Sequence, residues 1–389
     1  MRFFISAGEA SGDLYASRVV EALRRQYPEA EFFGCAGPRM QAAGVRTIVD
    51  QRSLAVVGIV EVIAHIPRIY GEFRKLVRAA EGEKPDVAVL TDSPDFHLRL
   101  AKKLHARGIP VVYLIAPQAW AWRSGRTRMM SRVLKRLLCI FPFEEKFFND
   151  RGVPTKFIGH PLARIVKPSM TRAAFCAKFG FQESDRLVVL LPGSRHGEAA
   201  RHMPYLIDAT RLISAKQNVK FVLALPSGFS AQTTTFWEPA RAASIQVIEG
   251  FTWDCLAQAE VALAASGTVT IEAALSKTPM VTFYRVNALS WILGRWMVEA
   301  PFLSMVNLVA GRKVAVELIQ KDMTAEAIAR EGLRLLEDSE ARATMREDLA
   351  EVAGKLASEA DPMETAATYI EMVIAEATGE AQRPGEKRS

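Results

Sequence analysis

The chain has 389 residues, more than one ordinary hydrophobic core holds and about right for two domains. Its hydrophobic content of 49% and charged content of 24% are ordinary for a soluble globular protein, and no apolar run approaches the ~18 residues of a membrane-spanning helix. The net charge is +7, and residues 96–143 carry ten Lys or Arg and no Asp or Glu, so the first half holds the basic surface. Such a surface suits nucleic acid, an anionic membrane or a phosphorylated substrate.

The cysteines and the N-terminus indicate the cellular compartment. Four cysteines lie far apart and form no Cys-x-x-Cys pair: Cys35, Cys139, Cys176 and Cys255. This spacing argues against zinc or a disulfide framework and suits a reducing cytoplasm. The N-terminus, MRFFISAGEASGD, reaches polar residues too soon for a signal peptide. We therefore expect a cytoplasmic protein that is soluble or lies on a membrane surface.

Short apolar runs alternate with helical patterns through most of the chain. In the first half, predicted strands cover residues 2–6, 31–35, 87–91, 111–115, 137–141 and 156–158, with a helix over residues 13–27. In the second half, predicted strands cover residues 187–191, 219–225, 245–248, 261–264 and 280–283. This order predicts an α/β fold of two doubly wound parallel sheets, with a cleft at the carboxyl ends of their strands.

The break between the two halves falls in GHPLARIVKPS, residues 159–169, which contains two prolines. From residue 324 onward the pattern is purely helical, and the last residues are polar. The predicted parts are a first domain over residues 1–165, a second domain over 166–355, a C-terminal helix over 356–378 and a disordered tail over 379–389.

The first strand is followed directly by a glycine-rich loop, SAGEASGD. Gly8 and Gly12 allow a tight turn and close backbone approach, and Ser11 or Asp13 can cap the helix that follows. The loop is not GxGxxG, so it does not indicate a dinucleotide site. Two interpretations remain equally open: a turn that holds an acceptor group or a phosphate, and a plain strand-to-helix turn.

Two carboxylates follow the strand over residues 87–91, in TDSPDFH. Asp92 and Asp95 lie at the carboxyl edge of the predicted sheet, where one can act as general base toward a hydroxyl nucleophile. The alternative is that either residue caps the helix after Pro94. We expect Asp95 to be the base and Asp92 to be a cap or support. The Asp-x-Asp sequence that holds a metal diphosphate is absent, so no metal is implied.

Tryptophans and arginines stand side by side in PQAWAWRSGR. Trp120 and Trp122 with Arg123 and Arg126 suit a sugar face or an anionic group, although one Trp is expected to pack in the core. His160 beside a proline in the linker is more often structural than catalytic.

Two loops of the second half suit a nucleotide. LPGSRHGE and ASGTVTIEAAL each begin where a predicted strand ends, and the second opens a helix, where exposed N–H groups favour a phosphate. Arg195 adds a cation that can bind the phosphate in a bidentate manner. Glu272 lies one turn into the second helix, where its carboxylate can accept hydrogen bonds from a ribose.

Two segments have the pattern of lipid contact. One is the apolar stretch with a cationic flank over residues 56–78, and the other is the amphipathic stretch ALSWILGRWM. Core packing is the commoner explanation of one such stripe, but the cations would suit anionic head groups. The residues expected to meet acyl chains or membrane are Val57, Ile59, Val60, Ile63, Ile292 and Trp296.

Taken together, these motifs resemble the lipid-A-disaccharide synthase family of bacterial glycosyltransferases. The matching motifs, in chain order, are SAGEASGD, LAVVGIVEV, TDSPDF, PQAWAWR, GHPL, LPGSRxxE, SGTVTIEAAL, MVTFYR and NLVAGRKVAVELIQ. The resemblance implies the GT-B fold, two Rossmann-like domains facing a cleft, with the acceptor in the first and the UDP-sugar in the second. It also implies that the last helices return to the first domain and that two copies can form a homodimer.

The family's reaction belongs to lipid A and lipopolysaccharide biosynthesis, at the cytoplasmic face of the inner membrane. It joins UDP-2,3-diacylglucosamine to 2,3-diacylglucosamine 1-phosphate (lipid X), giving the β-1,6-linked disaccharide 1-phosphate and UDP. An α-linked donor and a β-linked product require inversion, hence one displacement and one general base. No cofactor and no metal are implied.

The resemblance also assigns site residues. The donor site is implied to comprise Ser194, Arg195, Glu198, Ser266, Gly267, Thr268, Glu272, Asn307, Glu317 and Gln320. The acceptor site is implied to comprise Gly8, Glu9, Ser11, Gly12, Asp13, Trp120, Trp122 and Arg123, with Asp95 taking the proton of the 6-hydroxyl. Three positions depart from the usual family residues: His97 replaces Asn, Gln118-Ala119 replaces Ser and a branched residue, and Met305-Val306 replaces Leu-Pro.

Other functions fit the residues less well. An N-acetylglucosaminyl transferase of the same fold would carry a GGTGGH-like first loop, which is missing, and a UDP-sugar 2-epimerase would need carboxylates and a histidine that we do not find. A nucleic-acid-binding protein would leave the two nucleotide loops unexplained. A non-catalytic basic membrane-surface protein would explain the apolar helices, but not Asp95 with Arg195.

Overall fold

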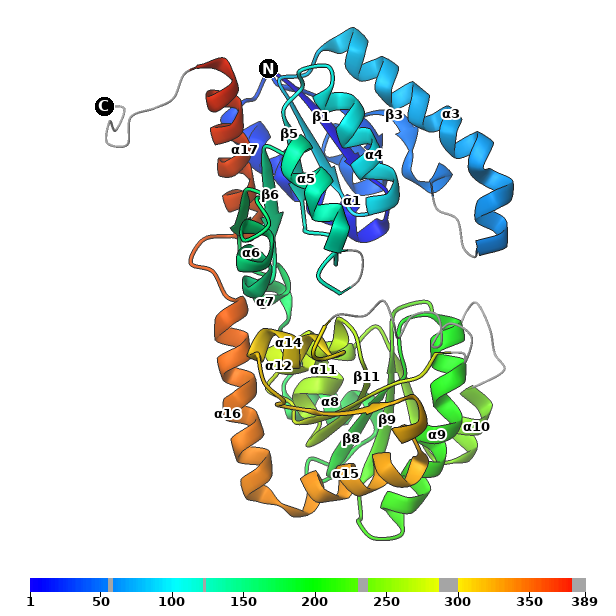
Figure 1. Cartoon of the computed structure of the whole chain (residues 1–389). Helices are drawn as coiled ribbons and strands as arrows, with labels where there is room; N and C mark the ends of the chain where they lie inside the picture. The colour runs from blue at the N-terminus through cyan, green and yellow to red at the C-terminus, as the bar shows by residue number, and fades with distance from the viewer. Residues whose placement is uncertain (55–58, 122–123, 230–236, 287–299, 380–389) are drawn as a thin grey trace. The chain divides into compact units, whose positions relative to one another are not determined.

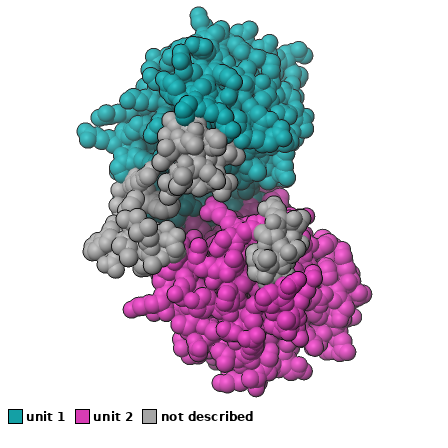
Figure 2. Space-filling model, turned by 90° about the vertical axis from the view of Figure 1, so that its right-hand side faces the viewer, with its two compact units in different colours: residues 1–161, 358–389 teal, residues 162–357 magenta. Residues whose placement is uncertain are grey.

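The computed structural model describes residues 1–54, 59–121, 124–229, 237–286 and 300–379 (Figure 1). The chain forms two compact units, which Figure 2 shows in separate colours. Unit 1 comprises residues 1–161 and 358–389, and unit 2 comprises residues 162–357. The first boundary falls at Pro161–Leu162, inside the predicted linker, and the second at Ala357–Ser358, two residues beyond the predicted end of the second domain.

Unit 1 is built on a seven-stranded sheet of order β3-β2-β1-β4-β5-β6-β7, in which every neighbouring pair is parallel. Its strands are β1 (Arg2–Ala7), β2 (Glu31–Ala36), β3 (Arg46–Asp50), β4 (Val87–Thr91), β5 (Val111–Leu114), β6 (Arg136–Cys139) and β7 (Thr155–Phe157). Every residue of the central strands β4 and β5 is buried, as expected for a parallel sheet covered on both faces.

Helices follow most strands of unit 1. They are α1 (Ala10–Gln26), α2 (Pro38–Ala42), α3 (Ile59–Glu83), α4 (Pro94–His105), α5 (Thr127–Val133), α6 (Pro142–Asn149) and the C-terminal α17 (Pro362–Thr378), with short 3-10 turns η1 (Gln51–Ser53) and η2 (Ser124–Arg126). The helix α17 comes from the far end of the chain yet packs on α1 and on strands of this unit, and Arg136 holds it through Glu376 at 3.0 Å (Figure 1). The C-terminal helix therefore returns to the first unit.

Unit 2 repeats the plan with a six-stranded sheet of order β10-β9-β8-β11-β12-β13, again parallel at every pair. Its strands are β8 (Leu187–Leu191), β9 (Lys220–Leu225), β10 (Gln246–Glu249), β11 (Val261–Ala265), β12 (Met280–Tyr284) and β13 (Val316–Ile319). Its helices are α7 (Leu162–Ile165), α8 (Arg172–Phe179), α9 (His196–Ser214), α10 (Trp237–Ala242), α11 (Thr252–Gln258), α12 (Val269–Leu275), α14 (Met305–Ala310), α15 (Ala325–Glu337) and α16 (Ser339–Leu356), with the 3-10 turn η4 (Gln320–Asp322).

The two doubly wound parallel sheets agree with the predicted fold. No helix in the described part of the chain is long and apolar enough to cross a bilayer. The predicted disordered tail over residues 379–389 lies outside the described residues except for Gly379, which ends α17 in a left-handed conformation.

Candidate functional site

In unit 1, the glycine-rich loop after β1 meets the turn after β4. The strands β1 and β4 are neighbours, with Ala7 opposite Thr91, so the segments that follow them leave the same edge of the sheet side by side. Asp92 joins the two segments: its Oδ1 accepts the Gly8 N–H at 2.7 Å and its Oδ2 accepts the Glu9 N–H at 3.0 Å. The carboxylate of Asp92 therefore supports the loop. From the sequence we expected it to be either a helix cap or a support.

The glycines of this loop make room for Asp92 and its neighbour. A Cβ atom at Gly12 would lie 1.7 Å from Asp92 Oδ2, and one at Gly8 would lie 2.3 Å from Ser93 Oγ. No side chain larger than hydrogen fits at either position while the turn after β4 keeps its place. The space that these glycines open is thus filled by the turn after β4. Contact of this loop with an acceptor group stays a prediction.

Asp92 has an unusual acidity for a carboxyl group. Burial, and to a smaller extent the charge of Glu9, raise the pKa of Asp92 to about 7 against the lowering effect of the hydrogen bonds from Gly8 and Glu9. A carboxylate with a pKa near neutrality can accept and release a proton at physiological pH.

Asp95 has a different environment. It lies in the first turn of α4, its side chain is 72% exposed, and it forms an ion pair with Arg126. Neither aspartate caps α4, because the N-cap residue is Ser93, which makes no side-chain capping bond.

Asp13 caps a helix other than the predicted one. It is 3% exposed and accepts the backbone N–H groups of Gly37, Arg39 and Met40, each at 3.0 Å, so it closes the start of α2. The helix α1 begins at Ala10 with Glu9 as N-cap, so neither Asp13 nor the exposed Ser11 caps it. Asp13 is occupied within the fold and is not available to an acceptor.

Trp120 is part of the core of unit 1. Its side chain is 8% exposed, its Nε1–H donates to Glu144 Oε1 at 2.9 Å, and its ring packs edge-on against Phe143. Burial raises the pKa of the Glu144 carboxyl to about 8, with the Trp120 hydrogen bond acting against the rise. Trp120 therefore offers no face to a sugar, which corrects its assignment to the acceptor site. Trp122 and Arg123 lie outside the described residues.

His160 in the linker and His196 in the loop after β8 both make contacts within the protein. His160 is 2% exposed and burial lowers its pKa to about 4, which agrees with a structural role. His196 opens α9, stacks on Phe229 and contacts the carbonyl oxygen of Phe229 through Nε2 at 3.0 Å.

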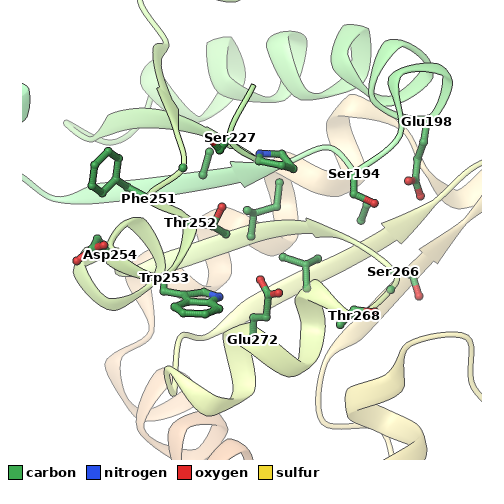
Figure 3. A pocket seen from close by; sticks show the side chains of 18 residues that line it. Ser194, Glu198, Ser227, Phe251, Thr252, Trp253, Asp254, Ser266, Thr268 and Glu272 are labelled. Carbon is green, nitrogen blue, oxygen red and sulfur yellow. The ribbon is translucent and has the colours of Figure 1, made fainter. Parts of the chain in front are cut away.

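Unit 2 contains a cavity of about 430 Å³ at the carboxyl edge of its sheet (Figure 3). Six of the predicted donor-site residues line it: Ser194, Glu198, Ser266, Gly267, Thr268 and Glu272. They come from the segments after β8 and β11, which are adjacent strands. Ser266 Oγ is buried and has no hydrogen-bond partner among the described residues, so its hydroxyl is available to bond a ligand.

The loop after β8 is shaped by one glycine. Gly193 has φ of +121°, and a Cβ atom there would lie 2.5 Å from the carboxyl carbon of Glu198. Burial raises the pKa of Glu198, while Arg195 lowers it. Arg195 is the exposed N-cap residue of α9. It stands next to Ser194 but is not among the residues that line the cavity.

Two aromatic residues of this cavity were not found from the sequence. Phe251 is the N-cap residue of α11 and Trp253 lies in its first turn. Both line the cavity, and the Trp253 side chain donates a hydrogen bond to Glu272 (Figure 3). Burial raises the pKa of Glu272, and the bond from Trp253 opposes that rise. A bulky aromatic pair in FTWD directly after a strand was the available signal.

Asn307 and Glu317 are saturated by their own unit. Asn307 is fully buried, and its amide bonds the backbone of Val314 and Ala315 and also Glu317 Oε1, at 2.8–2.9 Å. Glu317 further accepts the Ser304 N–H and Oγ–H at 2.9 and 2.6 Å. Both residues fix the segment around α14, and neither lines the cavity. Their assignment to the donor site stays a prediction from the family resemblance. Gln320 also lies outside the cavity lining, and its Nε2 is buried without a partner among the described residues.

The residues expected to meet lipid fall in parts that the structure leaves undescribed. Val57, Ile292 and Trp296 lie outside the described residues, and Ile59, Val60 and Ile63 belong to α3 with side chains that are not described. Farther along α3, Arg68, Arg74, Lys75 and Arg78 are exposed. Among the described residues, no three His, Cys, Asp or Glu side chains converge where a metal ion could be held.

The fold defines the class of protein. Solved structures similar to this chain include the UDP-GlcNAc 2-epimerase of Neisseria meningitidis bound to UDP-GlcNAc, at TM-score 0.60 and 12% identity, covering 97% of this chain and 100% of that one. Another is the calicheamicin glycosyltransferase, at TM-score 0.56 and 15% identity, covering 96% and 98%. Two Rossmann-like units with a cavity at the strand ends of the second are the GT-B architecture of glycosyltransferases and related epimerases.

The sequence then identifies the family. Residues 3–368 match the family model of lipid-A-disaccharide synthetases. The lipid-A-disaccharide synthase of Solibacter usitatus is 57% identical over 373 residues, covering 96% of this chain and 97% of that protein, and the synthase of Koribacter versatilis is 45% identical over 362 residues, covering 92% and 94%. The chain belongs to the lipid-A-disaccharide synthase family and is a glycosyltransferase.

Proposed function

We propose that this protein transfers 2,3-diacylglucosamine from UDP to the 6-hydroxyl of 2,3-diacylglucosamine 1-phosphate, with inversion and without a metal ion. The products are the β-1,6-linked disaccharide 1-phosphate and UDP. One observation carries the proposal: a chain of this family has a cavity of about 430 Å³ at the carboxyl edge of its second sheet, the usual place for a nucleotide in an open α/β unit.

The lining of the cavity suggests how UDP binds. Phe251 and Trp253 offer aromatic surface to the uracil, and Glu272, held by Trp253, accepts hydrogen bonds from the ribose. The unpartnered hydroxyl of Ser266 and the cation of Arg195 are suited to the diphosphate, which gains charge as it leaves. Stabilisation of that charge by fixed groups makes a divalent metal unnecessary for this step.

We assign the general base to Asp92 and give Asp95 the supporting role, which reverses the expectation from the sequence. Asp92 is half-buried, has a pKa of about 7 and keeps oxygen lone pairs beyond the two that accept Gly8 and Glu9. Asp95 is exposed and its charge is neutralised by Arg126. A base matched to neutral pH abstracts a hydroxyl proton more effectively than an exposed carboxylate that is already paired with a cation.

We also propose that the enzyme attaches peripherally to the cytoplasmic face of the inner membrane. The exposed cations Arg68, Arg74, Lys75 and Arg78 of α3 support this, because cations near a surface are attracted to anionic head groups. Binding to vesicles of anionic lipid should fall when three of these residues are changed to Ser, and unchanged binding would remove α3 from this role. Sedimentation of the purified protein tests whether it forms a homodimer.

The decisive experiment incubates the purified protein with both acylated sugars in excess chelator and identifies the product by mass. Asp92→Asn should lower turnover by about 10²–10⁴-fold and keep UDP affinity nearly intact, the usual contribution of a general base. Asp95→Asn is the matched variant and should stay within a few-fold of wild type. The opposite ranking would return the base to Asp95, and release of UDP without a disaccharide would favour the epimerase-like alternative.

A further inference from the structure

The turn that carries Asp92 has an unfavourable backbone. Asp92 and Ser93 follow one another with φ of 55° and 37°, the left-handed region that non-glycine residues rarely adopt. Two such residues in a row remain in place only when the surrounding structure over-determines them. Here the turn is held by groups that hydrogen-bond the carbonyl oxygen of Asp92.

Two buried side chains donate to the same carbonyl oxygen. The Tyr113 hydroxyl donates to the Asp92 carbonyl at 2.5 Å, and His97 Nδ1 lies 3.0 Å from that same oxygen. On the opposite side of its ring, His97 Nε2 lies 2.8 Å from Ser6 Oγ. Ser6, His97 and Tyr113 are all fully buried.

The partners fix the protonation of the imidazole. A carbonyl oxygen can only accept, so Nδ1 carries the proton, and Nε2 therefore accepts the hydroxyl proton of Ser6. Burial lowers the pKa of His97 to about 4, so the ring stays neutral and keeps this pattern at physiological pH. His97 Nδ1 also lies 3.8 Å from Asp92 Oδ1, which with a neutral ring is a close contact and not an ion pair.

We propose that His97 and Tyr113 are positioning residues that hold the strained Asp92 turn, so that the carboxylate stays on the Gly8 and Glu9 amides and is presented to the acceptor hydroxyl. The inference rests on the proposed role of Asp92 as base. It gives a physical meaning to His97, which stands where the family commonly has Asn. An imidazole bridges Ser6 on β1 to the Asp92 carbonyl in the turn after β4, with a donor at one end and an acceptor at the other.

Graded variants of the full-length enzyme separate positioning from packing. Tyr113→Phe removes one donor to the carbonyl and little volume, Ser6→Ala removes the group that orients the ring, and His97→Leu removes both ends of the bridge. His97→Asn restores one donor and one acceptor. Tyr369→Phe on α17 is the matched control, because its ring faces Arg136 and not the Asp92 turn.

We expect kcat to fall about 10–100-fold in Tyr113→Phe and more in His97→Leu, with KM for both sugars within about two-fold, because small misplacements of a catalytic group cost this much. The acidic limb of the kcat–pH profile should move to higher pH, since the backbone hydrogen bonds that lower the Asp92 pKa are loosened while burial persists. The charged groups near the turn, Glu9, Asp95 and Arg126, are unchanged in every variant, so the shift reports Asp92. His97→Asn should recover most of the kcat lost in His97→Leu.

Tyr113→Phe and Ser6→Ala remain informative if His97→Leu fails to fold. Variants that melt earlier but keep the wild-type kcat and pH profile would overturn the proposal and leave only a packing role. Asp92→Asn, assayed beside them, separates the two levels of the argument. An inactive Asp92→Asn with an unaffected Tyr113→Phe refutes the positioning role alone, whereas an active Asp92→Asn refutes the assignment of the base.

Discussion

Replacing Gly12 by alanine has two opposite effects on stability: a gain in helix propensity and a steric clash with Asp92. The structure predicts that the clash is the larger effect. Gly12 lies in α1, where alanine is preferred over glycine by about 1 kcal/mol. The new methyl group, however, would lie 1.7 Å from Asp92 Oδ2, so the carboxylate must retreat by more than an ångström. That movement breaks its bonds to Gly8 and Glu9, now 2.7 and 3.0 Å long.

The magnitude follows from these two bonds. Hydrogen bonds to a charged group contribute about 1.5–3 kcal/mol each, so their loss outweighs the gain in propensity and leaves a net destabilisation of about 2–5 kcal/mol. For a unit of this size, each kcal/mol lowers the melting temperature by about 2–4 °C, so the expected decrease is about 4–20 °C. The measurement should be made at pH 8, where Asp92, with a pKa of about 7, is mostly ionised.

A matched glycine shows the opposite sign. Gly71 lies inside α3, and a Cβ atom there would have nothing within 4 Å. Gly71→Ala should therefore raise the melting temperature of unit 1 by about 2–4 °C, in line with propensity alone. If Gly12→Ala melted at or above the wild-type temperature, the packing of Asp92 against this glycine, and with it the account of the SAGEASGD loop, would be refuted.

Three further predictions follow from single contacts. Arg195→Ala should weaken UDP binding about 10–100-fold by calorimetry, whereas Arg211→Ala on the same helix, paired with Asp208 at 2.8 Å, should not; equal affinities would remove Arg195 from the phosphate site. The pKa of Glu144 is about 8 in the folded protein against 4.5 ordinarily, so its contribution to stability is complete below pH 4.5 and is lost as the pH rises to 8. The free energy of unfolding of the wild type should therefore fall by up to about 1.4 kcal/mol per pH unit relative to that of Glu144→Gln. Parallel curves of unfolding free energy against pH would contradict this. Asp13→Ala should cost about 3 kcal/mol in urea unfolding and the exposed cap variant Asp338→Ala only about 1; equal losses would contradict the buried role of Asp13.

Hydropathy located the central strands because both faces of these strands are buried, so their residues are almost all apolar. The strands β4 and β8 coincide with the predicted runs at residues 87–91 and 187–191, and all their residues are buried. The strands β3 and β13 were missed. Both lie at sheet edges and are partly exposed, so RTIVD and VELI carry no continuous apolar run. A continuous apolar run marks a strand most clearly where both faces are covered, although the edge strands β7 and β10 were also predicted.

That several of the predicted donor-site residues line one cavity could be predicted from the sequence, because they come from loops whose place is fixed by strand order. Ser194, Ser266 and Glu272 reach one cavity since β8 and β11 pair directly. The contacts of Asp13 could not be predicted in this way. Its partners lie 24–27 residues away in α2, a tertiary arrangement that no local pattern encodes.

Hydrogen-bonding capacity separates the motif residues that bind ligand from those that shape the backbone. Both amide atoms of Asn307 are engaged, the oxygen by two backbone N–H groups and the nitrogen by Ala315 O and Glu317, so a ligand would have to displace a bond already made. Ser266 is the converse, with a buried hydroxyl that has no partner among the described residues. Leaving such a group unpaired costs free energy that a bound ligand returns. Replacing Ser266, which has hydrogen-bonding capacity to spare, is therefore expected to lower the affinity of the protein for UDP. Replacing Asn307, whose amide is saturated, is expected to lower its stability.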